Sequence, residues 1–288
     1  ALVFELFKFL KFFRKNKKNR IKTICVGNIY LGGTGKTPLV IRLYKIFKKQ
    51  GLKVAVGKKF YKSQLDEISL LENETSLITD SSRDKIIDKS LIEKKDLLIF
   101  DDGLQDRNIS YDVKLVCFDL DFFVGNGQLI PAGPLREKLD SLKKYDAVFL
   151  KGDSNNFENI HQLLKNYNPN IQIFKTSYKA VNLEKFNLKK DYLLFSGIGN
   201  PYSFKKIILK NNFNVVDEVI FPDHFEYKEK DLEKIKARAD KLTAQIITTE
   251  KDYIKIPENY RKNINFLKIN LEIDNEKNLI NFVKSKIN

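Results

Sequence analysis

Short apolar segments recur along this chain and are separated by amphipathic ones. The apolar segments span residues 21–29, 52–57, 96–102, 113–120 and 145–152. Residues 37–51 instead have the spacing of an amphipathic helix, with Gly51 as its stop. Strands that are apolar along their whole length are covered on both faces, as in parallel sheets flanked by helices. The sequence therefore predicts an α/β fold with a mostly parallel sheet.

The same alternation resumes in the second half of the chain. Residues 192–212 and 244–256 each begin with an apolar run and continue into a helical pattern. We predict a core formed by residues 21–180 and a second, smaller α/β lobe formed by residues 181–288, with a return to the core. A hinge between two such lobes would allow closure that excludes water from a site between them.

The first 20 residues form a segment of their own. Nine of the first 13 are large and apolar, and five Lys or Arg residues follow between Arg14 and Arg20. The apolar run is shorter than the roughly 20 residues that a membrane-spanning helix needs. The pattern favours a helix that lies in a membrane interface, with its basic end beside anionic headgroups. The alternative is a helix packed on its own domain.

A glycine-rich stretch, "VGNIYLGGTGKTPLV", joins the first apolar run to the first helical segment. It contains Gly32, Gly33, Thr34, Gly35, Lys36 and Thr37. Glycines let backbone N–H groups turn toward a phosphate, and the N-terminus of a helix adds partial positive charge. Lys36 would reach the β- and γ-phosphates, and the Thr37 hydroxyl would bind Mg²⁺. Tyr30 stands where the strict pattern has a glycine, so we predict a variant phosphate-binding loop of a P-loop NTPase-like fold.

Two aspartates follow a later apolar run in "DLLIFDDGLQ". A P-loop enzyme needs a carboxylate at the end of a neighbouring strand to hold Mg²⁺ or its water shell. Asp101 and Asp102 are therefore candidate metal-binding residues. The alternative is ordinary turn chemistry.

The overall charge indicates the kind of partner. A formal net charge of +15 favours an anionic partner, or else reflects only a lysine-rich surface.

Cys25 and Cys117 lie in apolar runs and are expected to be buried thiols. The only histidines are His161 and His224, so the sequence holds no Cys and His pattern of a zinc site.

Seven motifs, in order, resemble the tetraacyldisaccharide 4'-kinases of lipid A synthesis. They read "VGNIYLGGTGKTP", "LDEISLL", "DDGLQ", "GNGQLIPAGPLRE", "FSGIGNPYSF", "FPDHFEY" and "TTEKDYIKI". The resemblance covers most of the chain, and the family shares the variant loop. It implies a kinase that uses ATP and Mg²⁺ to phosphorylate the 4'-hydroxyl of an acylated glucosamine disaccharide 1-phosphate. The acceptor is a lipid, so the resemblance also implies a peripheral enzyme at the cytoplasmic face of the bacterial inner membrane.

The resemblance also implies roles for individual residues. Lys36 and Thr37 match the lysine that binds phosphate and the threonine that binds Mg²⁺. Asp101 and Asp102 match the acidic pair near the metal, which Glu137 of "PLRE" would join. Asp66 of "LDE" and His224 of "PDH" match the pair that activates the acceptor hydroxyl, and which of the two takes the proton stays open.

The chain departs from the family pattern at two places. Family members carry Ser-Arg-Gly-Tyr where this chain has "KKFY", Lys58 to Tyr61, so that Lys59 stands in place of the arginine. Lysine keeps the charge but lacks the planar fork that clamps a phosphate. Asp106 replaces the histidine that follows "DDGLQ", adding a negative charge near the acidic turn.

Two other readings stay open at this point. One is a P-loop ATPase without an acceptor, although Leu31 stands where the variant loop of those proteins has a lysine. The other is a non-catalytic nucleic-acid or membrane-binding protein, which would leave the phosphate loop unexplained. We expect a monomer that does not bind nucleic acid and that contacts an anionic membrane surface through residues 1–20.

Overall fold

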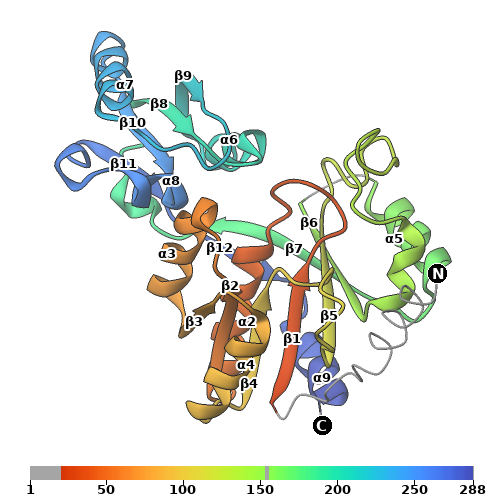
Figure 1. Ribbon diagram of the computed structural model, residues 1–288. Helices are drawn as coiled ribbons and strands as arrows, with labels where there is room; N and C mark the ends of the chain where they lie inside the picture. Colours follow the sequence, from red (N-terminus) through yellow and green to blue (C-terminus); the bar gives the residue numbers. More distant parts are fainter. Residues whose placement is uncertain (1–20, 153–155, 288) are drawn as a thin grey trace, which may run out of the picture.

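The structure, a computed structural model, describes residues 21–152 and 156–287 of the chain. It consists of two β-sheets with helices packed against them, and the smaller sheet lies above one end of the larger (Figure 1). The interfacial helix predicted for residues 1–20 lies outside the described residues. Within the two described ranges, no helix has both the length and the apolar character needed to cross a membrane.

The larger sheet has eight strands in the order β12-β7-β6-β5-β1-β4-β2-β3. Their bounds are β1 (Lys22–Gly27), β2 (Val54–Lys59), β3 (Leu77–Asp80), β4 (Leu97–Asp101), β5 (Val113–Asp119), β6 (Ala147–Lys151), β7 (Gln172–Ala180) and β12 (Ile269–Ile273). Only β12 runs antiparallel to its neighbour, β7. The predicted α/β fold with a mostly parallel sheet is therefore confirmed.

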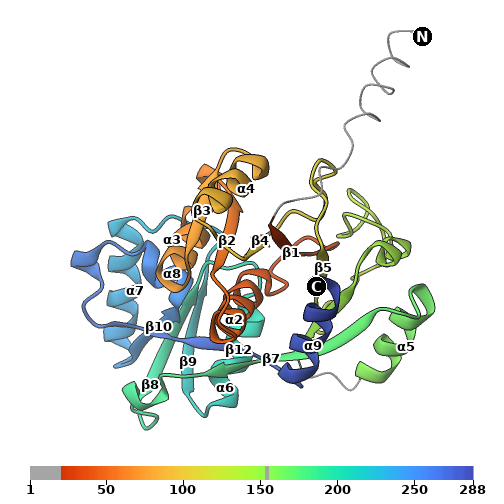
Figure 2. The same cartoon turned by 90° about the horizontal axis from the view of Figure 1, so that it is seen from below.

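Helices cover both faces of this large sheet. They are α2 (Lys36–Lys49), α3 (Leu65–Glu74), α4 (Arg83–Ile92), α5 (Phe157–Tyr167) and α9 (Glu276–Ile287). Successive residues of a strand point to opposite faces. Ile24 and Val26 accordingly pack in the cluster that contains α2 and α9, whereas Cys25 packs in the cluster that contains α4. Figure 2 shows α4 on the other side of the sheet from α2 and α9. Cys25 and Cys117 are buried free thiols, as expected.

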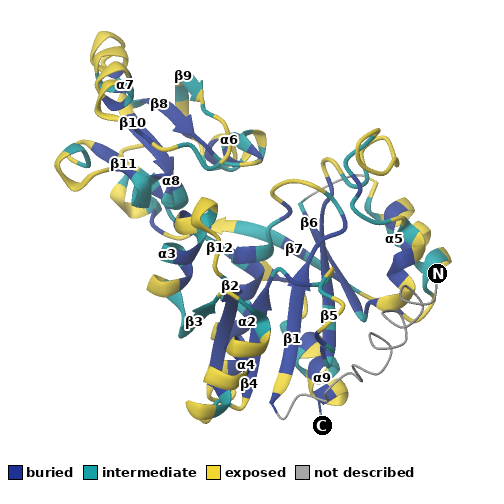
Figure 3. Cartoon of the chain, in the orientation of Figure 1, coloured by how far each residue is buried: buried dark blue, intermediate teal, exposed yellow. Residues whose placement is uncertain are grey.

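The smaller sheet has four parallel strands in the order β11-β10-β8-β9. Its elements are β8 (Asp191–Ser196), α6 (Pro201–Lys210), β9 (Asn214–Ile220), α7 (Glu229–Lys241), β10 (Gln245–Thr249), α8 (Glu250–Lys255) and β11 (Ile264–Leu267). Helix α6 contributes to one of its two core clusters and α7 to the other. The inner strands of both sheets are buried, and exposed residues gather on the outer helices and loops (Figure 3). Among the described residues, short 3-10 helices span Lys62–Gln64, Leu139–Lys144, Leu183–Lys185 and Glu258–Tyr260.

The chain passes between the sheets twice, once after β7 and once between β11 and β12. The two passages are bonded to each other. Val181 N donates to Lys268 O at 3.0 Å, and Lys268 N donates to Asn182 Oδ1 at 2.8 Å. Asn182 Nδ2 in turn donates to Phe266 O at 3.0 Å. The division of the chain into domains at residue 180 stays a prediction, but the polypeptide does return to the large sheet through β12 and α9.

Helix α4 offers a direct test of this packing. Ile86 is fully buried between α4 and the sheet, whereas Ile92, on the same helix, is 80% exposed. We expect Ile86→Ala to lower the free energy of unfolding by about 2–5 kcal/mol, because it leaves a cavity in the core. Ile92→Ala should change it by less than about 0.5 kcal/mol. Urea unfolding followed by circular dichroism measures both, and equal effects would contradict the described placement of α4.

Candidate active site

The glycine-rich stretch forms a turn between β1 and α2. Gly32 has a φ of 123° and Gly35 a φ of 86°, both in the left-handed region that favours glycine. The Asn28 side chain braces the turn by donating from Nδ2 to Thr34 Oγ1 at 3.1 Å. Gly35 is the N-cap of α2, and the first N–H groups of a helix have no partner within it. The turn therefore has the backbone shape of an anion-binding loop.

The acidic turn lies beside this loop because β4 pairs with β1 in parallel. The register places Asp101 opposite Val26. Thr37 Oγ1 donates to Asp101 Oδ2 at 3.1 Å. Asp101 Oδ1 is buried and has no hydrogen-bond partner within the part of the chain that the structure describes. Asp102, with a φ of 62°, lies 3.8 Å from Lys36 Nζ through its Oδ2.

These side chains fit a magnesium ion that is bound together with phosphates. Mg²⁺ usually takes one or two oxygen ligands from the protein and the rest from phosphates and water. The Thr37 hydroxyl and the unpartnered Asp101 Oδ1 match that donor set. Across the described ranges, no group of three or more His, Cys, Asp or Glu side chains is arranged to hold a metal without such help.

Glu137 lies near the start of the phosphate loop. Its carboxylate accepts hydrogen bonds from Tyr145 Oη at 2.9 Å and from Gln105 Nε2 at 3.0 Å. Gln105 Nε2 also donates to Asn28 O at 3.0 Å, which links Glu137 to the start of the phosphate loop. The contacts of Glu137 thus run to Gln105 and Tyr145 rather than to Thr37, and its role at a metal stays a prediction.

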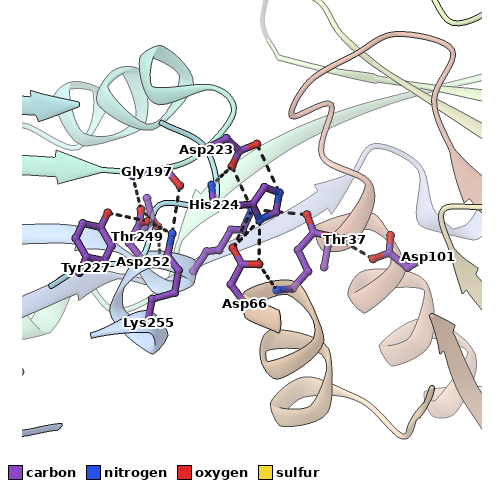
Figure 4. A network of polar contacts seen from close by, with 12 residues as sticks. Thr37, Asp66, Asp101, Gly197, Asp223, His224, Tyr227, Thr249, Asp252 and Lys255 are labelled. Carbon is purple, nitrogen blue, oxygen red and sulfur yellow. Dashed lines mark hydrogen bonds and ion pairs between the residues drawn. The ribbon is translucent and has the colours of Figure 1, made fainter. Parts of the chain in front are cut away.

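Asp66 and His224 meet although 158 residues separate them in the sequence. Asp66 lies in the first turn of α3, beside the large sheet, and His224 follows β9 of the small sheet. His224 Nδ1 is 3.0 Å from Asp66 Oδ1 and 3.1 Å from Asp66 Oδ2 (Figure 4). A proton on Nδ1 is donated to this carboxylate, which leaves Nε2 as the nitrogen able to accept another. Asp66 itself is buried.

Lys251 joins this pair from the start of α8. Its Nζ lies 3.3 Å from Asp66 Oδ2, 3.6 Å from Glu67 Oε1 and 3.4 Å from Asp223 Oδ1. Burial alone would raise the pKa of Glu67, but the ammonium groups of Lys58 and Lys251 lower it to about 2. Glu67 is therefore a carboxylate at neutral pH. Neither Lys251 nor Glu67 was predicted as a site residue, although Lys251 lies in "TTEKDYIKI" and Glu67 in "LDEISLL".

The residues that depart from the family pattern, Lys58, Lys59 and Asp106, each have a partner in the structure. Lys58 is buried and forms ion pairs with Asp101 and Glu67, so it is not available to clamp a phosphate. Lys59 Nζ lies 5.2 Å from the centre of the Tyr61 ring. Asp106 Oδ2 pairs with Arg83 Nη1 at 3.0 Å, so its negative charge is balanced. In the sequence, the sign of the buried ion pair of Lys58 was a lysine directly after the apolar run "VAVG", within the same strand.

A second buried ion pair lies on the other side of the phosphate loop. Lys151 Nζ is 2.6 Å from Asp119 Oδ2, which also accepts from Asn200 Nδ2 at 2.9 Å. Asn200 is the N-cap of α6, so this contact joins the two sheets. A methyl group on Gly35 would come within 3.0 Å of Tyr178 Oη and 3.2 Å of Lys151 Cδ. The loop is therefore packed closely against this pair.

A cavity of about 340 Å³ connects these groups. Its walls include the phosphate loop, Asp102, His224 and Lys251, together with apolar side chains of both sheets. The sheets approach closely at its edge, because a methyl group on Gly199 would lie 3.2 Å from Gly33 N. The site thus lies in a cleft, with the phosphate loop on one wall and His224 on the other.

The family profile and the relatives that match this chain agree on one family. A family profile described as tetraacyldisaccharide-1-P 4'-kinase matches residues 2–288. The tetraacyldisaccharide 4'-kinase of Pelagibacter ubique is 43% identical over 268 residues, which are 93% of this chain and 85% of that protein. The enzyme of the same name from Rickettsia bellii is 37% identical, over 82% of this chain and 77% of that protein.

One solved structure is similar over nearly the whole chain. It is the crystal structure of LpxK from Aquifex aeolicus in complex with ATP, with a TM-score of 0.70 and 23% sequence identity. The similarity covers 99% of this chain and 94% of that one. At this identity the match shows the shared fold, which is P-loop NTPase-like.

Two glycines with the same backbone conformation test the phosphate loop. Gly35 and Gly51 both have a φ of 86°, but only Gly35 is crowded by neighbours. We expect Gly35→Ala to weaken ATP binding at least tenfold, because the added methyl group displaces the loop from Tyr178 and Lys151. Gly51→Ala carries similar backbone strain away from the site and should leave ATP affinity unchanged. Isothermal titration calorimetry measures both, and equal losses would show that the effect is not local to the loop.

Proposed function

The chain belongs to the tetraacyldisaccharide-1-P 4'-kinase family, and we propose from this premise how its residues carry out the reaction. The protein is a phosphotransferase that moves the γ-phosphoryl group of ATP to the 4'-hydroxyl of a tetraacyldisaccharide 1-phosphate. The contact between Asp66 and His224, opposite the phosphate loop, is the observation that supports a hydroxyl acceptor in the cleft.

We assign the donor side of the reaction to the first wall of the cleft. The backbone of residues 32–35 and the Lys36 ammonium hold the phosphates of ATP and offset their negative charge. Mg²⁺, held by the Thr37 hydroxyl and Asp101 with Asp102 nearby, would neutralise charge on the phosphate oxygens. Phosphoryl transfer depends mostly on such positioning and charge neutralisation. The buried contact between Thr37 and Asp101 supports this assignment.

We assign the acceptor side to Asp66 and His224. The 4'-oxygen forms a bond to the γ-phosphorus as the bond from that phosphorus to the β,γ-bridging oxygen breaks, which releases ADP. The hydroxyl proton passes to the Asp66–His224 pair, whose hydrogen bond orients the accepting group. The ammonium of Lys251 holds the Asp66 carboxylate in place from the small sheet.

The nature of the acceptor supports a peripheral enzyme at the cytoplasmic face of the bacterial inner membrane. The acyl chains keep the disaccharide in a bilayer, so the kinase has to meet it at the surface. The apolar and basic sequence of residues 1–20 supports this segment as the docking element. A monomeric state and the absence of nucleic-acid binding stay predictions.

Transfer to the lipid is the direct test of this function. The assay follows labelled γ-phosphate from ATP into a 1-phosphorylated tetraacyl glucosamine disaccharide in detergent micelles. We expect labelled lipid with the wild type and at least a hundredfold less with Lys36→Ala, because the γ-phosphate loses its neutralising cation. ATP hydrolysis without labelled lipid would instead support the acceptor-independent ATPase.

Replacing Asp66 separates acceptor activation from nucleotide binding. Asp66→Asn keeps the shape of the side chain but removes its charge and its capacity to accept a proton. We expect kcat to fall by about 10²–10⁴-fold, while ATP affinity stays within about threefold of the wild type.

The matched control for Asp66→Asn is Asp84→Asn. Both aspartates lie in the first turn of a helix, Asp84 in α4 and Asp66 in α3, so both changes remove a favourable charge from a helix N-terminus. Asp84 is exposed, whereas Asp66 is buried. Steady-state kinetics should show near-normal turnover for Asp84→Asn. Near-normal turnover for Asp66→Asn would overturn the assignment of the pair.

A further inference from the structure

A buried lysine lies between the phosphate loop and helix α3. Lys58, the penultimate residue of β2, is only 2% exposed. Its Nζ donates to Asp101 Oδ2 at 2.9 Å and to Glu67 Oε2 at 2.8 Å. Lysine is almost never this buried unless it is paired. Both of its partners belong to the site described above.

The local packing holds this lysine in place. A methyl group added to the preceding residue, Gly57, would lie 2.9 Å from Ile86 Cγ2 and 3.0 Å from the Phe100 ring. The strand is therefore packed closely against α4 and β4 at the residue before Lys58. The parallel register pairs Gly57 with Phe100, so the next residues along, Lys58 and Asp101, are neighbours across the two strands.

The ammonium of Lys58 stays charged in this environment. Its Nζ lies within ion-pair distance of two carboxylates, 2.9 Å from Asp101 Oδ2 and 2.8 Å from Glu67 Oε2, so its positive charge is paired although it is buried. A permanent positive charge thus lies at the carboxylate proposed to face the metal. Asp101 Oδ2 is shared by Lys58 and Thr37, whereas Asp101 Oδ1 has no partner in the described ranges.

Cations offset much of the negative charge around the acidic turn. The carboxylates of Asp101, Asp102 and Glu67 are in contact with the cations Lys58, Lys36, Arg136 and Lys251, and Lys251 also contacts Asp66 and Asp223. Within the described ranges Asp101 pairs with Lys58 and with no other cation, so without Lys58 its charge would be unopposed and its attraction for a divalent cation in this partly buried site would be strong. The lysine therefore weakens the field that a free metal ion would meet.

We propose that Lys58 is a positioning residue that offsets the charge of Asp101, the carboxylate that faces the metal, while the site holds no nucleotide. Free Mg²⁺ then binds this site poorly and enters as its complex with ATP, whose phosphates supply the missing negative charge. Lys58 also ties Asp101 of the metal side to Glu67, the neighbour of Asp66 on α3. The inference rests on the proposed function only for the assignment of Mg²⁺ to Thr37 and Asp101.

Direct metal titration tests this role without measuring turnover. Free Mn²⁺ is followed by electron paramagnetic resonance as it binds the full-length, nucleotide-free protein. We expect Lys58→Met to bind Mn²⁺ at least tenfold more tightly than the wild type, because the resident cation no longer opposes it. A merely structural role predicts the opposite, since a disrupted site holds metal less well.

Lys59→Met is the matched control. It removes the same charge from the adjacent position of β2, where the ammonium lies over Tyr61 instead of at Asp101. Its affinity for Mn²⁺ should stay within about twofold of the wild type. Unchanged or weaker binding by Lys58→Met would overturn the proposal, and so would an equal gain in both variants.

A second variant guards against loss of folding. Lys58→Met leaves the buried carboxylates of Asp101 and Glu67 without their shared partner, which is destabilising. The double variant Lys58→Met/Glu67→Gln removes one of these charges and still lacks the cation at Asp101. It should also bind Mn²⁺ more tightly than Glu67→Gln alone, and equal affinity of the two would contradict the proposal. Failure of lipid phosphorylation with this Mn²⁺ result intact would instead count against the acceptor assignment.

Discussion

The shared edge of three parallel strands is the constraint on which the rest of the site depends. β2, β4 and β1 are neighbours, and their pairing brings their carboxyl ends to the same level. The ends of these strands supply Lys58, Asp101 and the phosphate loop, and the Thr37 hydroxyl that follows the loop closes onto Asp101. A shift of one residue in either pairing would turn these side chains to the other face of the sheet. The apolar strand interiors that hold the register thus also hold the polar contacts.

The large sheet alone does not complete the site. His224 and Lys251 come from the small sheet and contact Asp66, so the proposed acceptor machinery exists only where both sheets meet. Asn200 makes a similar connection on the other side of the loop through Asp119. The two sheets are therefore joined by polar contacts at two places, Asp66 with His224 and Asp119 with Asn200.

Part of this arrangement could be predicted from the sequence and part could not. The strand, glycine loop and helix around Lys36 are contiguous, so local pattern was sufficient to predict them. The contact between Asp66 and His224 joins residues 158 positions apart, and only family resemblance suggested it. The burial of Lys58 was missed because it depends on which strand lies next to β2, and strand order is not written in any local pattern. For Glu137 the motif predicts a metal-binding role, and the structure adds its hydrogen bonds to Gln105 and Tyr145 while that role stays a prediction.

The small sheet is joined to the large one by two neighbouring passages that are hydrogen-bonded to each other through Val181, Asn182 and Lys268. A body held by a single tether can both swivel and bend. Two neighbouring connections resist twisting of one sheet against the other more than they resist bending. Any closure of the cleft would therefore favour a bending motion, which brings the imidazole of His224 back to the carboxylate of Asp66.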